Sequence, residues 1–197
     1  AQRLITLAQP APFGRGSETI TDESVRKAWE IDAAVLAFHN PAWEATLAHI
    51  LQSVQTGLGL TQQGIEAQLY KLLIYEEGGF FLPHKDSEKA AGMFGTLIVA
   101  LPSEHEGGTL HVRFGGEEEQ VDFAPATQQY QLPFAAFYAD CEHEIKPVTS
   151  GYRLCLVYNL VQQSGGAIPS PDISQQVDQL VALLQEGHYD GKFPAAV

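Results

Sequence analysis

Cysteine is scarce in this chain: its 197 residues include only Cys141 and Cys155. Two cysteines cannot form a disulfide framework, and their spacing excludes a C-x-x-C zinc motif. We therefore expect two reduced thiols in an intracellular protein, cytoplasmic or nuclear. The two residues could lie on neighbouring strands, so a single disulfide between them stays open.

Basic residues are also few. Lys and Arg together number 11 against 24 Asp and Glu, which gives a formal net charge of −13. The long-range field of such a chain repels both nucleic-acid phosphates and anionic lipids. We therefore expect neither a membrane nor a nucleic acid as a partner, although the net charge does not exclude a local basic pocket.

Long hydrophobic runs are missing. The longest, such as Leu154–Leu160, are far too short to span a bilayer, and no charged segment followed by an apolar run opens the chain. The first residue is Ala1 rather than Met, as expected of a processed chain or of a piece of a longer one. Hydrophobic residues nevertheless make up 45% of the sequence, so we expect one globular domain over residues 1–197.

The order of predicted elements favours a mainly β fold with flanking helices. Apolar residues at helical spacing predict helices over 41–56 and 171–187, whereas residues 1–20 are expected to be irregular. Successive strands without alternating helices are typical of a sandwich or jelly-roll, here with a core over about residues 65–162 and an N-terminal arm and helix over 1–60. β-rich segments separated by turn residues predict strands over 67–75, 95–101, 109–114, 119–123, 135–138 and 152–161.

Three side chains form a candidate metal site. His84 and Asp86 stand two residues apart, so on an extended backbone they point to the same face. His143, in the stretch Cys141-Glu142-His143-Glu144-Ile145, is the candidate third ligand. Two histidines and one carboxylate make the facial triad of non-haem Fe(II) oxygenases, which leaves coordination positions for a co-substrate and O2.

Arg153 follows His143 by ten residues in the last predicted strand. Residues 147–151 predict a turn that would return this strand beside the strand end that carries His143. Arg153 shares one strand face with Cys155, Val157 and Asn159.

An arginine on the inward face of an apolar strand is costly unless an anion meets it. That anion could be an internal carboxylate, such as Asp86 or Asp122, or the distal carboxylate of an organic acid held by two hydrogen bonds.

An ordered series of motifs between Tyr70 and Leu160 resembles the Fe(II)/2-oxoglutarate-dependent dioxygenases, and within them the prolyl 4-hydroxylase-like branch. The series is Tyr75-x-x-Gly78, His84-x-Asp86, the strand Thr96–Leu101, Glu106-Gly107-Gly108-Thr109-Leu110, and His143-x-x-x-Pro147-Val148-x-x-Gly151-x-Arg153. No single motif is specific, but their ordered combination is.

The resemblance implies a double-stranded β-helix, Fe(II), 2-oxoglutarate and O2, and it leaves a need for ascorbate open. It implies that the enzyme hydroxylates a substrate, first of all a peptidyl residue such as proline, and releases succinate and CO2. The implied catalytic residues are His84, Asp86 and His143 as iron ligands and Arg153 as the partner of the 2-oxoglutarate C5 carboxylate.

Further roles follow from the same resemblance. Tyr75 falls where this branch often has a tyrosine that reaches the co-substrate, and Thr96 falls where a hydroxyl can help hold the C5 carboxylate. Phe81 departs from the pattern, because many relatives have tyrosine there. Residues 1–60 lie outside the shared motifs, and the arm over 1–30 is expected either to recognise substrate or to cover a sheet edge.

Other functions stay open at this point. A non-catalytic, metal-containing β-sandwich could bind a partner, and an oxygenase with the same residues could act on a small molecule or a nucleoside. A zinc hydrolase could use the same three ligands, but Arg153 would then have no purpose.

Overall fold

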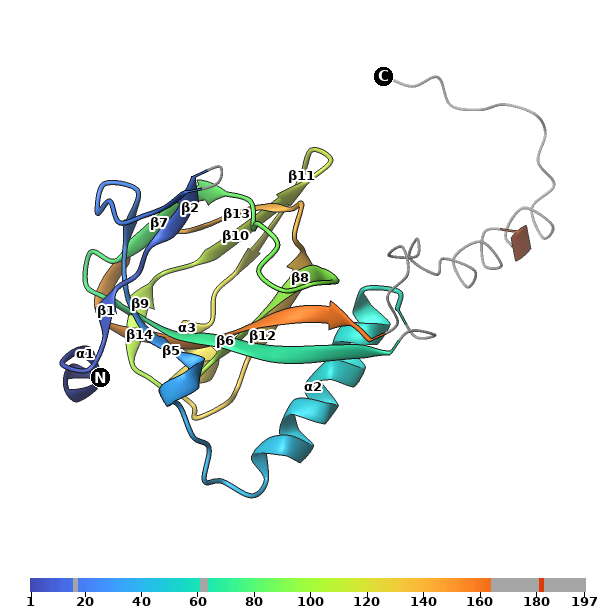
Figure 1. Cartoon of the computed structure of the whole chain (residues 1–197), viewed down its shortest axis with the longest axis horizontal. Coiled ribbons are helices and arrows are strands. Elements are labelled where there is room, and N and C mark those ends of the chain that lie inside the picture. Colours follow the sequence, from blue (N-terminus) through green and yellow to red (C-terminus); the bar gives the residue numbers. More distant parts are fainter. Residues whose placement is uncertain (16–17, 61–63, 164–180, 183–197) are drawn as a thin grey trace.

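The structure is a computed structural model that describes residues 1–15, 18–60, 64–163 and 181–182. Its body consists of two antiparallel sheets (Figure 1). The larger sheet has the order β1 (Gln9–Pro10), β5 (Trp29–Asp32), β6 (Ile65–Glu76), β14 (Val148–Gln162), β8 (Met93–Ala100) and β12 (Phe134–Tyr138), and β9 (His105–Gly107) also pairs with β14. The smaller sheet has the order β11 (Glu117–Val121), β10 (Leu110–Phe114), β13 (Glu142–Ile145), β7 (Phe80–His84) and β4 (Arg26–Lys27).

Short elements and one long helix complete the fold. β2 (Phe13–Arg15) and β3 (Glu18–Ile20) form a separate hairpin, and α2 (Trp43–Gly57) is the long helix. The remaining elements are α1 (Gln2–Ile5), η1 (Ala33–Val35) and α3 (Ala124–Thr127). The arrangement confirms the predicted mainly β jelly-roll with helices outside the sheets.

The central strands of the larger sheet are buried on both faces. In β6, Leu73 and Tyr75 belong to the core cluster shared with the smaller sheet, whereas Leu72 and Ile74 belong to a second cluster. That second cluster also holds buried side chains of α2, which runs along the outer side of the larger sheet (Figure 1). Strands covered on both faces lose the alternation of polar and apolar residues, and this explains their continuous apolar sequence.

All six predicted strands are present, with bounds shifted by a few residues. The predicted turn over 147–151 is wrong, because β14 already begins at Val148. β14 pairs with β6 and β8 in the larger sheet, so Arg153 and His143 lie in opposite sheets rather than on neighbouring strands.

The predictions for the two ends of the chain fare differently. The helix predicted over 41–56 is confirmed as α2, although Asn40 accepts a hydrogen bond from the Ala42 N–H one turn before the helix begins. The prediction that residues 1–20 are irregular is wrong, because this segment contains α1, β1, β2 and β3. β1 pairs with β5 at the edge of the larger sheet. The helix predicted over 171–187 lies outside the described residues, apart from 181–182.

Two observations bear on the remaining expectations. Cys141 and Cys155 are both free and buried, so no disulfide joins them. Among the residues that the structure describes, no helix has the length and apolarity needed to cross a membrane.

The two-sided burial of the central strands predicts a large stability cost for truncation. Leu97, in β8, is completely buried in the cluster beneath α2, whereas Leu7 is 77% exposed. We expect Leu97→Ala to lower the free energy of unfolding by about 2–5 kcal/mol. Leu7→Ala should change it by less than about 0.5 kcal/mol. Urea denaturation measures both, and equal effects would contradict this description of the core.

Candidate active site

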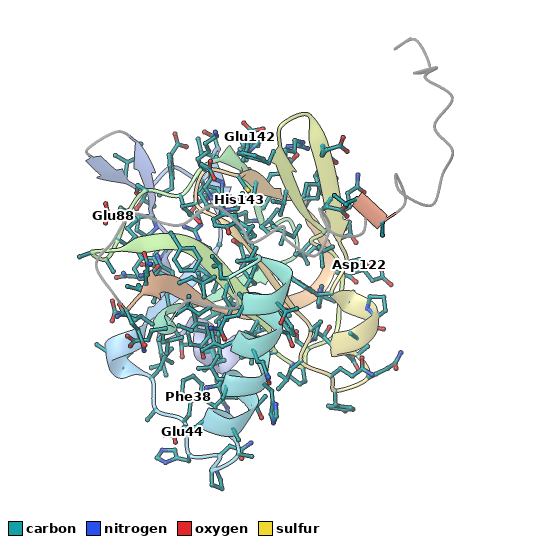
Figure 2. All side chains as sticks on the ribbon, turned by 90° about the vertical axis from the view of Figure 1, so that its right-hand side faces the viewer. Phe38, Glu44, Glu88, Asp122, Glu142 and His143 are labelled. Atoms are coloured by element: carbon teal, nitrogen blue, oxygen red, sulfur yellow. The ribbon has the colours of Figure 1, made fainter. Side chains whose placement is uncertain are left out.

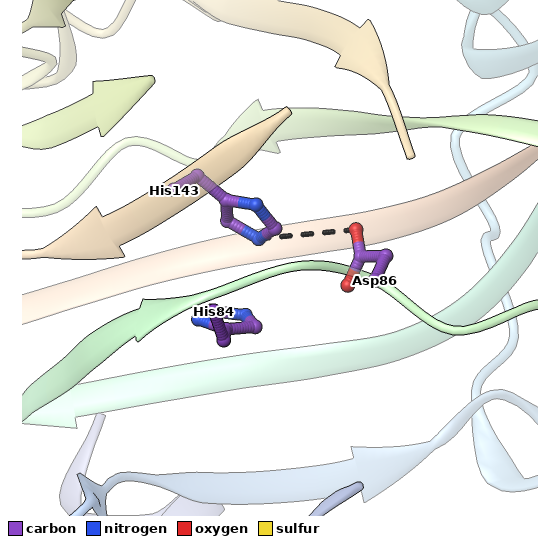
Figure 3. Close-up of side chains that lie close together, drawn as sticks. All are labelled: His84, Asp86 and His143. Atoms are coloured by element: carbon purple, nitrogen blue, oxygen red, sulfur yellow. Dashed lines mark ion pairs between the residues drawn. The ribbon is translucent and has the colours of Figure 1, made fainter. Parts of the chain in front are cut away.

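The three predicted metal ligands converge at one point of the molecule. His84 ends β7, His143 lies in the adjacent strand β13, and the two residues are register partners. Asp86 follows β7 by two residues, and one ligand atom from each side chain lies within 4.8 Å of the others. Figure 3 shows the three side chains directed toward a common centre.

Local hydrogen bonds orient both imidazole rings. His84 Nδ1 lies 2.9 Å from the Leu82 carbonyl oxygen, and His143 Nδ1 lies 3.2 Å from the Cys141 carbonyl oxygen. In each ring Nδ1 therefore donates to the backbone, which leaves the Nε2 lone pair for a metal ion.

Burial keeps the two imidazoles neutral. It lowers the pKa of His84 to about 3, with a further contribution from neighbouring His143. Burial also lowers the pKa of His143, although the Asp86 carboxylate opposes that decrease. Neutral imidazole is the form that ligates metal ions.

The carboxylate of Asp86 is held in place from the larger sheet. Its Oδ2 accepts a hydrogen bond of 2.5 Å from the Thr96 hydroxyl and lies 3.8 Å from His143 Nε2, the pair marked by the dashed line in Figure 3. Thr96 therefore orients a candidate metal ligand. Its predicted contact with the co-substrate stays a prediction.

The position of His143 inside the molecule is clear in Figure 2, where neighbouring Glu142 lies toward the outer surface. His143 is only 5% exposed. The ring of Phe81 stacks on that of His84 with 3.5 Å between centroids, and the ring centroids of Phe137 and His143 lie 4.6 Å apart. The ligands thus sit against apolar rings, which limit access of water to one side of the site.

These residues suit Fe(II) as a tightly organised donor set. Two neutral nitrogens and one carboxylate oxygen are borderline donors that first-row divalent ions accept. Both histidines and the aspartate also have the second hydrogen bond that metal ligands in proteins usually make.

Arg153 is a completely buried side chain in β14. Its Nε and Nη2 have no hydrogen-bond partner among the described residues, and Nη1 makes only a 3.4 Å contact with Cys155 Sγ. Burial raises the pKa of the Cys155 thiol, so that thiol is protonated and supplies no negative charge.

Neither internal carboxylate considered from the sequence compensates Arg153. Asp86 accepts a hydrogen bond from the Thr96 hydroxyl, and Asp122 accepts a hydrogen bond from the Ala124 N–H at the start of α3. Figure 2 shows Asp122 beside α3, away from His143. No ion pair to Arg153 occurs in the described part of the chain, so its guanidinium fits an anion that comes from outside.

A glycine makes room for this arginine. A Cβ atom added to Gly108 would lie 2.8 Å from Arg153 Cδ, and the residue has a φ of +68°, where side chains are strained. The backbone of the Glu106-Gly107-Gly108 motif therefore lies close to the Arg153 side chain.

Tyr75 stands beside Arg153. The two are register partners on β6 and β14, and Arg153 Cζ lies 5.4 Å from the centroid of the tyrosine ring. Both line one cavity of about 360 Å³ that also includes His84, Asp86 and His143. The structure therefore brings every predicted site residue, Thr96 included, to the same cavity.

Two charged residues of this cavity were not predicted as site residues, although Arg26 belongs to the arm over 1–30 that was expected to contact substrate or cover a sheet edge. Arg26, from β4, and Lys71, from β6, both line it and are each 7% exposed. Lys71 forms a buried ion pair with Glu30. No apolar alternation marks the two-residue strand that carries Arg26, so the sequence gives no signal for its inward direction.

Comparison with known proteins agrees with this geometry. Residues 70–161 match the 2OG-Fe(II) oxygenase superfamily. A PKHD-type hydroxylase from Sphingopyxis alaskensis is 22% identical over 103 residues, which cover 52% of this chain and 44% of that protein. The chain thus spans less than half the length of this relative.

Solved structures share the fold. A prolyl-4-hydroxylase from Pseudomonas putida superposes with a TM-score of 0.54 and 19% identity, over 83% of this chain and 82% of that one. A prolyl hydroxylase from Trichoplax adhaerens, in complex with a hypoxia inducible factor peptide fragment, has a TM-score of 0.51 and 15% identity, over 76% and 70% of the two chains.

The match over residues 70–161 includes the three converging ligands and the buried arginine. Residues 70–161 are thus similar to the 2OG-Fe(II) oxygenase superfamily, and the chain has a prolyl 4-hydroxylase-like fold.

The converging ligands predict that metal binding depends on each histidine. His84→Ala or His143→Ala should weaken Fe(II) binding by more than about 100-fold, because losing an outer hydrogen-bond partner alone costs 10–100-fold. His49→Ala, on an exposed position of α2, is the matched control and should bind like the unmodified chain. Anaerobic equilibrium dialysis measures binding, and circular dichroism checks the fold. Unchanged Fe(II) binding in either variant would overturn the ligand assignment.

Proposed function

We propose that the protein is an Fe(II)- and 2-oxoglutarate-dependent hydroxylase whose iron ligands are His84, Asp86 and His143. The observation that carries this proposal is the buried, uncompensated guanidinium of Arg153 in the cavity that the three ligands share. A metal site that only stabilised the fold, or a zinc hydrolase, would have no need of this charge.

Arg153 is proposed to bind the C5 carboxylate of 2-oxoglutarate. Its free Nε and Nη2 are adjacent donors, which is the geometry that a carboxylate accepts in a bidentate manner. Tyr75, 1% exposed and next to Arg153, is proposed to donate its hydroxyl to the same co-substrate. Burial raises the pKa of Tyr75, so the hydroxyl keeps its proton at neutral pH.

His105 lies near Arg153 and adds no positive charge beside it. It is 2% exposed, lies in β9, and is the register partner of Gly151 in β14, the strand that carries Arg153. Burial, and then the charge of Arg153, lower the pKa of His105, so its imidazole is neutral near pH 7. The charge offered to the co-substrate therefore comes from Arg153.

The bound iron would supply activation of O2, coupled to decarboxylation of 2-oxoglutarate to succinate and CO2 and to transfer of an oxygen atom into a substrate C–H bond. The chain itself would position the two reactants and exclude water with the rings of Phe81 and Phe137. Ascorbate is proposed as an optional addition that keeps the iron reduced.

A peptidyl residue, with proline first, is the proposed substrate. Support comes from the prolyl 4-hydroxylase-like fold, and the related Trichoplax structure is a complex with a peptide fragment. Phe13 of the β2–β3 hairpin lines the cavity, which supports a contact between the N-terminal segment and a substrate, and β1 of the same segment covers a sheet edge.

The activity test is formation of succinate from 2-oxoglutarate by the protein with Fe(II), O2 and ascorbate. We expect slow succinate formation without substrate and faster formation with proline-containing peptides, one of which gains an oxygen atom detectable by mass spectrometry. Fe(II) binding without any succinate formation would instead indicate a non-catalytic metal site.

Loss of the guanidinium should weaken co-substrate binding strongly. Truncating one partner of a buried charge pair costs about 2–5 kcal/mol, so Arg153→Ala should raise the dissociation constant for 2-oxoglutarate by about one and a half to three and a half orders of magnitude. Titration calorimetry on the Mn(II)-loaded protein measures this, and Mn(II) affinity should stay unchanged.

Arg113→Ala is the control for that experiment. Arg113 lies in β10, pairs with Glu118 and Glu144, and does not line the cavity. This variant should bind 2-oxoglutarate normally. A dissociation constant within about twofold of normal in Arg153→Ala would remove Arg153 from the proposed role.

A further inference from the structure

Arg26 brings a second guanidinium into the cavity from outside the matched region of residues 70–161. It lies in β4 at the edge of the smaller sheet, where it is the register partner of Phe81 on β7. Its guanidinium carbon lies 4.4 Å from the centroid of the Phe81 ring. The edge pairing and the ring stacking hold this side chain in the cavity, where it is 7% exposed.

The hydrogen bonds of Arg26 leave it incompletely satisfied. Nη1 donates to the Pro12 carbonyl oxygen at 2.6 Å, the side chain also forms a hydrogen bond with the Tyr75 side chain, and Nε is buried without a partner. No ion pair to Arg26 occurs in the described ranges, whereas Lys71 on the opposite wall is paired with Glu30. Of these two cationic side chains, only the positive charge of Lys71 is therefore compensated within the described chain.

The charges of the loaded site do not compensate Arg26 either. A divalent iron, the Asp86 carboxylate, a 2-oxoglutarate dianion and the Arg153 guanidinium sum to zero charge. Arg26 would then remain as a buried, unpaired cation, which is unfavourable. A further negative charge in the cavity would remove that cost.

The position of Arg26 favours the substrate rather than the co-substrate as the source of this charge. Arg26 stacks on Phe81, and Phe81 stacks on the iron ligand His84. Arg26 thus reaches the candidate metal ligands, beside which the C–H bond to be hydroxylated must be placed, as well as Tyr75. Pro12 and Phe13, on the same N-terminal segment, line the cavity beside it.

We propose that Arg26 binds a carboxylate of the primary substrate, so that the substrate carries an acidic group close to the carbon that is hydroxylated. This inference rests on the proposed oxygenase function. A cavity of about 360 Å³ that also holds 2-oxoglutarate admits only a short acidic group. That group is either the terminal carboxylate of a peptide or free acid, or the side-chain carboxylate of an acidic residue.

Matched acid and amide probes test this proposal. On the protein loaded with Mn(II) and 2-oxoglutarate, titration calorimetry compares N-acetyl-L-proline with its primary amide, and N-acetyl-L-aspartic acid α-amide with N-acetyl-L-asparagine amide. The acid of at least one pair should bind about tenfold or more tightly than its amide, as a charge-assisted hydrogen bond requires. The pair that shows this preference identifies the terminal or the side-chain carboxylate as the group recognised.

Variants then assign the preference to Arg26. Arg26→Gln should reduce the acid-to-amide ratio to about one while the dissociation constant for 2-oxoglutarate stays within about threefold. Lys27→Gln is the matched control, because it removes the same charge from the next residue, whose Nζ contacts the Glu77 carbonyl oxygen outside the cavity lining. It should keep the preference. If Arg26→Gln does not fold, the ratio of acid affinity to amide affinity is measured on Arg26→Lys and on the unmodified protein instead.

The outcomes separate the two proposals. Absence of any acid preference in the unmodified protein overturns the role of Arg26, even when 2-oxoglutarate binds normally. Loss of 2-oxoglutarate affinity in Arg26→Gln as large as in Arg153→Ala also overturns it, because Arg26 would then be part of the co-substrate clamp. Binding of 2-oxoglutarate to the unmodified protein is measured before any probe is added. If 2-oxoglutarate does not bind, the oxygenase function and the inference that rests on it are both overturned.

Discussion

The buried, unpaired guanidinium of Arg153 is the constraint on which the rest of the site depends. A charge of this kind is tolerated only where the surrounding structure holds it in place and where an anion from outside meets it. Gly108 leaves the space that the arginine stem occupies, Tyr75 and Phe123 provide aromatic faces, and neutral His105 adds no competing charge. The stability of the jelly-roll therefore maintains a cationic cavity in a chain of net charge −13.

The two sheets contribute different parts of the site. The smaller sheet carries His84 and His143 on adjacent strands, and the larger sheet carries Arg153 and Tyr75. Thr96 links the two parts, because it belongs to the larger sheet and binds the Asp86 carboxylate. Packing of one sheet against the other thus sets the separation between the candidate metal ligands and Arg153, and mutations in the shared core should disturb both.

Much of this arrangement could be predicted from the sequence, and the failures have physical causes. The long apolar strands were found because burial on both faces gives them continuous hydrophobic sequence. β7 and β13 were missed because each has only four or five residues and carries the polar ligands His84 and His143. The prediction that the Arg153 strand lies beside His143 was wrong. Register and pairing between distant strands depend on tertiary packing, which local turn signals do not encode.

Arg26 was missed for a related reason. Its strand has two residues, too few for any periodicity, and its inward direction follows only from its pairing with Phe81. The N-terminal segment was expected to be irregular, yet it supplies both an edge strand and a wall of the cavity.

The central claim is that one cavity binds Fe(II) and 2-oxoglutarate together, with the oxo acid chelating the iron. Anaerobic absorption spectroscopy tests this most directly, because Fe(II) chelated by a 2-oxo acid has a visible charge-transfer band that neither component has alone. The account predicts that the band appears only when protein, Fe(II) and 2-oxoglutarate are all present, and that succinate, which lacks the oxo group, gives none. Absence of the band from protein that has bound both Fe(II) and 2-oxoglutarate would contradict the account.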